Sequence, residues 1–292
     1  MSGRANAPLW LVRAVWLAQP LAFVTMLDDA TAHLPDSGRV VVAVSAWTIW
    51  AAVLLAALVP STVSITTGRL AAPMLLATAA LCGVTGVAGW RLALGMGAAV
   101  VTTLVWFSGE TGTALAQGSA YGSEQRFPLK PPVPLLVPMF VSWAVLCAST
   151  LGAIVLLANR SWGAGIVVLA VALAVAYFVG PRFHQLSRRW LVVVPAGVVV
   201  HDPMMLTENA LFRTTQLAAL HLAPADTEAA DLTGGTPGAA IEIVLHQMDT
   251  IVRTGTRSDP AGTALHVLSV LVSPTRPGKV LTAAAGRRLP VG

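Results

Sequence analysis

The stretch PRFHQLSRRWLVVVPAGVVVHDP, residues 181–203, marks a change from one structural pattern to another. The residues just before it form a long apolar run without a charged side chain. Within it, the β-branched runs LVVV and VVV surround Pro195-Ala196-Gly197, which is a hairpin signal. The sequence therefore predicts a membrane-like helical part that ends near Pro181 and a β-rich part that begins near Arg188.

The composition supports this division. Of the 292 residues, 55% are hydrophobic and 11% are charged, and the mean hydropathy is +0.73, whereas a soluble domain has roughly 25% charged residues. Ten of the eighteen Lys and Arg residues lie in 181–292. The net charge is +5, but no basic run interleaved with aromatic residues is present, which argues against nucleic-acid binding. We expect a helical transmembrane bundle over 1–181 and a small, mostly β domain over 188–292.

A hydrocarbon core about 30 Å thick requires roughly 20 apolar residues of helix. Runs of about this length predict six spans, at residues 8–27, 40–59, 70–90, 92–107, 134–158 and 162–179. The first contains Arg13, Gln19 and Pro20, so a surface-lying helix, with five spans in total, is an alternative. A signal peptide fits less well, because an Arg interrupts the apolar stretch and no clear cleavage site follows.

Basic residues indicate the sidedness of the bundle. With six spans and a cytoplasmic N-terminus, seven basic residues lie inside (Arg4, Arg69, Arg126, Lys130, Arg182, Arg188 and Arg189) and three lie outside (Arg39, Arg91 and Arg160). This asymmetry agrees with the positive-inside rule. We expect a bacterial plasma-membrane protein whose C-terminal domain is cytoplasmic. Trp10, Trp90, Trp106, Trp162 and Trp190 all fall near predicted span ends, where aromatic belts form.

The basic residues after the last span predict a contact with lipid. Arg182, Arg188 and Arg189 lie at the expected inner surface, where each basic residue contributes about 1 kcal/mol to the attraction for anionic headgroups. Arg13 lies near the same surface and is expected to reach it by extending its long side chain. These four arginines are the predicted lipid-headgroup residues.

Strand-like segments continue after the hairpin, at 211–222, 239–247, 250–254 and 265–272, and KVLTAAAGRRL near the end suits a helix. The acidic, Gly-rich stretch 223–238 is predicted to be a loop. The segments RRWLVVVPAGVVVHD and LFRTTQLAALHL, followed by further strands and a closing helix, resemble the pleckstrin-homology-like (PH-like) domains of multi-span bacterial membrane proteins. EQRFPLKPP (124–132) and GRRLPVG (286–292) are similar to stretches of uncharacterised actinobacterial multi-pass proteins. The resemblance implies a partly open barrel with a C-terminal helix, used for binding.

The segment between the fourth and fifth spans, residues 108–134, is long for a membrane loop. Its first half is small and polar, and its second half is rich in proline and therefore extended. On the favoured topology it shares the cytoplasmic side with the β domain. We expect Gln125–Lys130, with Gln125, Arg126 and Lys130, to dock on that domain. A solvated linker is the alternative.

No group of residues in the sequence predicts a particular chemical reaction. The six His residues are scattered, and neither a metal-ligand spacing nor a nucleotide-binding motif is present, so no cofactor is expected. The sequence favours a non-enzymatic scaffold whose β domain engages a protein partner or inner-leaflet lipid. A component of a transport or envelope-lipid export system is the alternative. A membrane enzyme using Glu110, His201 or Asp202 is a third reading.

Overall fold

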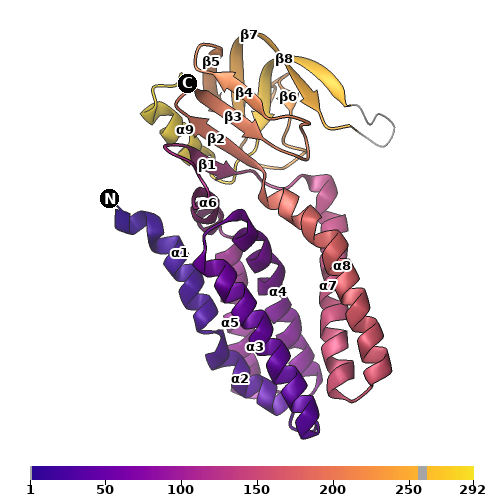
Figure 1. The fold of residues 1–292 in the computed structure, drawn as a ribbon. Coiled ribbons are helices and arrows are strands. Elements are labelled where there is room, and N and C mark those ends of the chain that lie inside the picture. Colours follow the sequence, from indigo (N-terminus) through magenta and orange to yellow (C-terminus); the bar gives the residue numbers. More distant parts are fainter. Residues whose placement is uncertain (1, 256–261) are drawn as a thin grey trace. The chain divides into compact units, whose positions relative to one another are not determined.

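The computed structural model of the chain describes residues 2–255 and 262–292 (Figure 1). The chain forms two compact units. The helix unit comprises Met1–Gly118 and Met139–Phe183, and the β unit comprises Ser119–Pro138 and His184–Gly292. The predicted boundaries of 1–181 and 188–292 therefore need a correction, because 119–138 belongs with the strands. Hydrogen bonds hold this segment to the β unit, as described below.

The helices of the chain are long and mostly apolar. Within the described residues, six helical stretches are long and apolar enough to cross a membrane: Asn6–Ala30, Asp36–Leu58, Thr62–Val84, Gly89–Phe107, Val133–Ala158 and Trp162–Ser187. The first consists of α1 (Ser2–Leu17) and α2 (Gln19–Ala30), and the others are α3, α4, α5, α7 and α8. A short helix, α6 (Gly109–Gln117), follows α5. The prediction of about six apolar helices before a β-rich part is confirmed.

Two predicted helices have wrong bounds. The span predicted at 70–90 begins earlier and ends earlier, as α4, because the turn that follows contains Gly86 at φ 102° and Gly89 at φ 68°. These left-handed conformations favour glycine and interrupt the helix. At the other end, α8 passes through Pro181 and continues to Ser187. A proline removes one backbone donor, but the helix continues for six residues beyond it.

Pro20 explains the break between α1 and α2. Because proline has no N–H, the carbonyl of Trp16, four residues earlier, loses its helical donor. The indole Nε1 of Trp50 on α3 donates to this carbonyl at 3.0 Å, and Nε1 of Trp16 donates to the Trp50 carbonyl at 2.9 Å. This reciprocal pair of bonds joins α1 to α3. Arg13 adds to the same contact by donating to the carbonyls of Ala57 and Leu58 at the end of α3.

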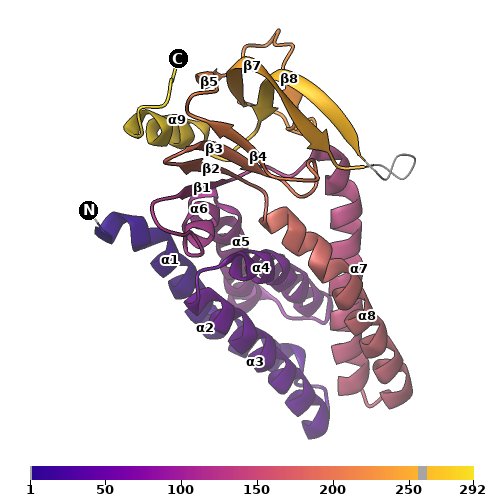
Figure 2. The same ribbon diagram turned by 45° about the horizontal axis from the view of Figure 1, so that its top comes forward.

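The β unit contains two four-stranded sheets among its described residues (Figure 2). The first has the order β1-β2-β3-β4, and the second has the order β5-β7-β8-β6. Their bounds are Gln125–Pro128 (β1), Trp190–Val194 (β2), Gly197–His201 (β3), Ala210–Arg213 (β4), Leu217–Leu222 (β5), Ala230–Asp231 (β6), Ile241–Arg253 (β7) and Thr263–Val272 (β8). The helix α9 (Pro277–Gly286) contacts β2 and β5.

The hairpin predicted from the opening stretch is present, because β2 and β3 pair with Val194 opposite Gly197. Gly197 has φ 144°, and a Cβ atom there would lie 2.1 Å from the Phe212 carbonyl oxygen, so glycine is required. The strand predicted at 211–222 is in fact two strands, β4 and β5, which lie in different sheets. The strands predicted at 239–247 and 250–254 form one, β7, with an irregularity in its pairing between Val244 and Asp249.

Alternating side chains of both sheets form one apolar core in the β unit. Leu191, Val193, Val198 and Val200 from the hairpin are fully buried. They pack in one cluster with residues of the second sheet and with Val280 and Ala284 of α9. The period-two pattern that predicted the strands thus also identifies the residues that hold the two sheets together.

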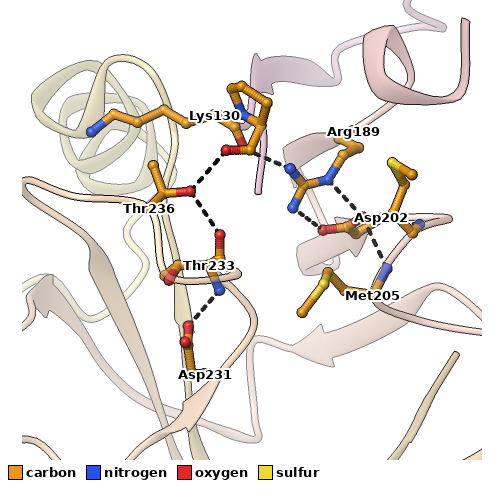
Figure 3. Close-up of polar contacts among 9 residues, drawn as sticks. Lys130, Arg189, Asp202, Met205, Asp231, Thr233 and Thr236 are labelled. Atoms are coloured by element: carbon orange, nitrogen blue, oxygen red, sulfur yellow. Dashed lines mark hydrogen bonds and ion pairs between the residues drawn. The ribbon is translucent and has the colours of Figure 1, made fainter. Parts of the chain in front are cut away.

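A buried ion pair fastens the segment before α7 to this core (Figure 3). The Arg189 side chain is 1% exposed; its Nε and Nη2 donate to the two carboxylate oxygens of Asp202 at 2.7 and 2.6 Å. Its Nη1 donates to the Lys130 carbonyl at 2.5 Å. The expectation that Arg189 contacts lipid headgroups is therefore wrong, because its guanidinium is enclosed and fully engaged within the β unit.

Backbone bonds continue this attachment along the segment. β1 pairs antiparallel with β2, and the Lys130 amide donates to the Ser273 carbonyl at 2.9 Å. Thr236 Oγ1 donates to the Pro131 carbonyl at 3.0 Å, and the Val133 amide donates to the Gly234 carbonyl. The structure thus places Gln125–Lys130 within the β unit, as an edge strand and its extension. The Lys130 ammonium donates to the Pro237 carbonyl.

We expect Asp202→Asn to destabilise the β unit by about 3–5 kcal/mol, because it leaves the buried Arg189 charge without a counterion. The double variant Arg189→Met/Asp202→Leu should recover much of this loss. Hydrogen exchange of β2 and β3 peptides in the intact chain measures the effect, with Arg213→Gln as an exposed control. Unchanged exchange in Asp202→Asn would show that the pair does not stabilise the unit.

Candidate functional site

The candidate site of the β unit is built around Trp190, the first residue of β2. Trp190 is directly opposite His201 of β3, and the two rings stack with centroids 5.1 Å apart and an interplanar angle of 18°. The guanidinium of Arg126 on β1 lies 5.0 Å from the centre of the Trp190 ring, within range of a cation–π interaction. Arg126 is opposite Val192, so it lies diagonally from Trp190 on the same face of the sheet.

Arg126 is fixed in this position by an acidic neighbour. Its Nε and Nη2 donate to Glu124 Oε1 at 3.0 and 2.6 Å, and its Nη1 donates to Ser119 Oγ at 3.3 Å. The side chains of Arg126 and Glu124 are 13% and 18% exposed. Arg126 is therefore a partly buried, oriented cation.

His201 is held by a hydrogen bond at one ring nitrogen only. Nδ1 lies 2.6 Å from Asn209 Oδ1, while Nε2 is buried and has no partner among the described residues. Because the Asn209 oxygen accepts, Nδ1 carries the proton of the neutral ring and Nε2 has a free lone pair. Protonation would give Nε2 an N–H for which the described residues provide no acceptor.

The environment of His201 disfavours that protonation in the free protein. Burial lowers the pKa of His201 below its ordinary value of 6.5. The Asn209 hydrogen bond and Asp202 act in the opposite direction, and the charges of Arg188 and Arg126 lower the pKa further. Arg188 therefore lies near enough to His201 for its charge to be felt, and the cluster has an excess of positive charge.

We name this group, consisting of Arg126, Arg188, Trp190 and His201, the basic cluster. It brings together Arg188 from the predicted headgroup residues and Arg126 from the predicted docking segment. Arg188 is exposed and directly follows the end of α8. Arg182 is also exposed, but it lies on α8 in the helix unit. Arg13, likewise in the helix unit, stacks on Trp10 and caps the end of α3.

Sequence reasoning missed the role of Trp190, Asn209 and Glu124. Trp190 was expected in an interfacial belt, but its side chain is only 7% exposed and lies between Arg126 and His201. The sequence did carry a signal for this position. Trp190 directly precedes the β-branched run LVVV, so it stands at the start of a predicted strand and not at the end of an apolar helix. The carboxylate of Asp202, a candidate in the enzyme reading, accepts from Arg189 and from the amides of Met204 and Met205. Within the described residues, no group of three or more His, Cys, Asp or Glu side chains could hold a metal ion.

The charge of Arg188 gives a testable prediction. Arg188→Gln should raise the pKa of His201, because it removes a cation that disfavours protonation. The measurement is a pH titration of the His201 ring signals by NMR in the intact, reconstituted chain. Arg213→Gln, an equal charge change on exposed β4, should leave the titration unchanged. An equal shift of the His201 pKa in both variants would show that Arg188 has no specific effect on His201 and does not belong to the cluster.

The same shift predicts a dependence of stability on pH. The folded β unit binds a proton at His201 less readily than the unfolded chain does, since the pKa is lowered. The contribution of His201 to stability is therefore present above pH 6.5 and is lost as the pH falls below that value. Thermal unfolding of the β unit between pH 7.5 and 5 should show this loss, and His201→Gln should reduce it.

Comparison with known proteins identifies no relative. No protein-family model matches the chain, and neither a curated protein sequence nor a solved structure matches it significantly. The functional interpretation therefore depends on the geometry described above.

Proposed function

We propose that the chain is a non-enzymatic, membrane-anchored binding protein whose β unit is a PH-like module in the bacterial cytoplasm. Its ligand is the anionic headgroup surface of the inner leaflet, engaged by the basic cluster. The observation that carries the proposal is that the Arg126 guanidinium lies over Trp190, which stacks on His201, while exposed Arg188 directly follows the apolar helix α8 and precedes this strand by two residues. A cation that directly follows a membrane-crossing helix lies close to the membrane surface, and no other part of the chain has to bring it there.

The order of elements supports a PH-like fold. Two sheets, antiparallel except for the short parallel pairing of β6 with β8, share one core, and the helix α9 packs on the unit near its C-terminal end. β1 would be an addition to this arrangement, contributed by the segment before α7. Fold alone does not identify a ligand, so the argument for headgroup binding rests on the basic cluster.

The electrostatics of His201 favour an anionic ligand. An anion beside the cluster would offset the positive charges of Arg126 and Arg188, both of which lower the pKa of His201. Binding should therefore raise the pKa of His201 and take up a proton. The cation–π contact with Trp190 and the ion pair with Glu124 fix Arg126 before binding, which lowers the entropic cost of holding a ligand.

The path of the chain supports an anchoring role. The β unit includes Ser119–Pro138 and His184–Gly292, so the chain passes between the helix unit and the β unit three times. The β unit is therefore attached to apolar helices at three points of the sequence and needs no separate anchor to stay at a membrane.

The proposal predicts selective retention of anionic lipid. In nanodiscs of mixed phosphatidylglycerol and phosphatidylcholine, the double variant Arg126→Gln/Arg188→Gln should lose phosphatidylglycerol enrichment. A contribution of about 1 kcal/mol per basic residue corresponds to roughly a fivefold loss for each substitution. Native mass spectrometry of the released protein counts the bound lipids. Arg213→Gln is the matched control, and enrichment in the wild type should weaken as salt is raised.

Two outcomes would contradict the proposal. Equal enrichment in the wild type and the double variant, combined with loss of a co-purifying protein, would favour a protein partner. Labelling of Glu208→Cys by an impermeant thiol reagent added outside the cell would place the β unit on the external side of the membrane, whereas the proposal requires it to be cytoplasmic. The native Cys82 and Cys147 are buried, so this label reports on the introduced residue.

A further inference from the structure

The helix unit contains a cavity of about 460 Å³ between α2, α3 and α4, with Leu151 of α7 on its wall. This volume falls within the range of about 300–1,000 Å³ that is usual for small-molecule sites. Most of the lining is aromatic or aliphatic, including Phe23, Trp47, Met74 and Leu75. The interior is therefore suited to a hydrocarbon chain.

The cavity is open along one flank of the helices. Val24, Val40 and Trp47 line it, and their side chains are 42%, 60% and 48% exposed. These residues belong to stretches that are apolar enough to cross a membrane. An apolar chain could enter sideways from a bilayer without first passing through water.

The inner end of the cavity is closed and carries a polar atom. Trp16 and Trp50, joined by their reciprocal indole–carbonyl bonds, line this end together with Gln19. Gln19 is 4% exposed; its Nε2 donates to Thr102 Oγ1 at 2.5 Å and to the Val15 carbonyl at 3.1 Å. The Val15 carbonyl can only accept, which fixes the orientation of the amide. Gln19 Oε1 has no hydrogen-bond partner among the described residues.

The other end of the cavity carries charges of both signs. Asp28, near the end of α2, and Asp36 and Arg39, in the first turns of α3, line the mouth. All three are exposed, and the ion pairs found among the described residues involve none of them. A ligand with an anionic group and a cationic group could pair with both kinds of charge.

The length of the cavity matches one leaflet. Arg39 at the mouth and Trp50 at the inner end are eleven residues apart on α3, which corresponds to about 17 Å of helix. Half of a hydrocarbon core about 30 Å thick is roughly 15 Å. A chain with its headgroup at Arg39 would therefore end near Trp16, Trp50 and Gln19.

We propose that this cavity binds one acyl chain of a zwitterionic, phosphoethanolamine-type phospholipid. The phosphate pairs with Arg39, the ammonium pairs with Asp28 and Asp36, and the chain lies between α2, α3 and α4. This site is separate from the basic cluster, which takes anionic headgroups. Two features distinguish it from an ordinary groove filled by bulk lipid: the buried end at Trp16 and Gln19, and the charges of both signs at the mouth.

The buried end of the cavity sets the length of chain that fits. Trp16 and Gln19, which line this end, are 1% and 4% exposed. A chain that reaches them has no further space between the helices, so the rest of a longer chain must stay outside the cavity. In a bilayer a longer chain gains nothing from burial in the protein, because the lipid tails around it are equally apolar. The site should therefore select by chain length.

The experiment is lipid retention by the full-length chain in nanodiscs that contain phosphatidylethanolamines with chains of about 10 to 18 carbons. Native mass spectrometry identifies the lipids that remain bound. Arg39→Gln should lower retention at least fivefold, because it removes the phosphate partner. Gln19→Ala, which shortens a side chain at the buried end, should shift the retained lipids toward longer chains. Ala46→Phe, which places a ring in the cavity, should abolish retention.

Arg160→Gln is the matched control, because Arg160 is an exposed arginine that bonds Ser37 and does not line the cavity. It should retain lipid as the wild type does. Equal retention by Arg39→Gln and Arg160→Gln would overturn the headgroup assignment. So would equal retention of phosphatidylglycerol and phosphatidylethanolamine by the Arg126→Gln/Arg188→Gln variant, in which the basic cluster no longer contributes. Full retention by Ala46→Phe, in protein that still elutes as a folded species, would overturn the cavity as the site.

Discussion

The buried Arg189–Asp202 pair is the constraint on which the organisation of the β unit depends. A charge enclosed in an apolar core is unfavourable unless a counterion and further hydrogen bonds satisfy it. Arg189 meets this requirement with Asp202 and the Lys130 carbonyl, and Asp202 with two backbone amides as well. Because Lys130 comes from the segment before α7, satisfying the charge fixes that segment to the sheet. The β unit is thus completed by residues on both sides of the helices that interrupt it.

Neighbouring arginines in this region have different roles because they differ in burial. Arg188 is exposed, and its charge acts on His201. Arg189 is enclosed, and its ion pair with Asp202 stabilises the β unit. The basic run therefore cannot act as one uniform patch. Arg126 shares the charge of the basic cluster, although it is 62 residues before Arg188 in the chain, because β1 pairs with β2.

The sequence predicted well the features that depend on local patterns. Apolar runs identified the long helices, and β-branched alternation identified the β2–β3 hairpin. The sequence did not predict the features that depend on contacts between residues far apart in the chain. Gln125–Pro128 reads as an extended, proline-rich linker, and it becomes a strand only because the edge of β2 is free to accept it. The burial of Arg189 has no local signal, since its partner Asp202 lies beyond a complete hairpin. The cavity is lined by ordinary apolar residues whose spacing matches that of any buried helix face.

Pro20, in the first helical stretch, leaves one backbone carbonyl without its helical donor, and the residues that satisfy this carbonyl also line the cavity. Pro20 cannot donate to the Trp16 carbonyl, and a carbonyl left unpaired in an apolar setting is costly. Trp50 supplies the missing donor, and this requires its indole to extend across to α1. The returning bond from Trp16 to the Trp50 carbonyl fixes both rings. Since these bonds depend on no ligand, the inner end of the cavity is formed before anything enters it. A preformed site spends little of its binding free energy on ordering the protein, so recognition can be decided by chain length and by the charges at the mouth.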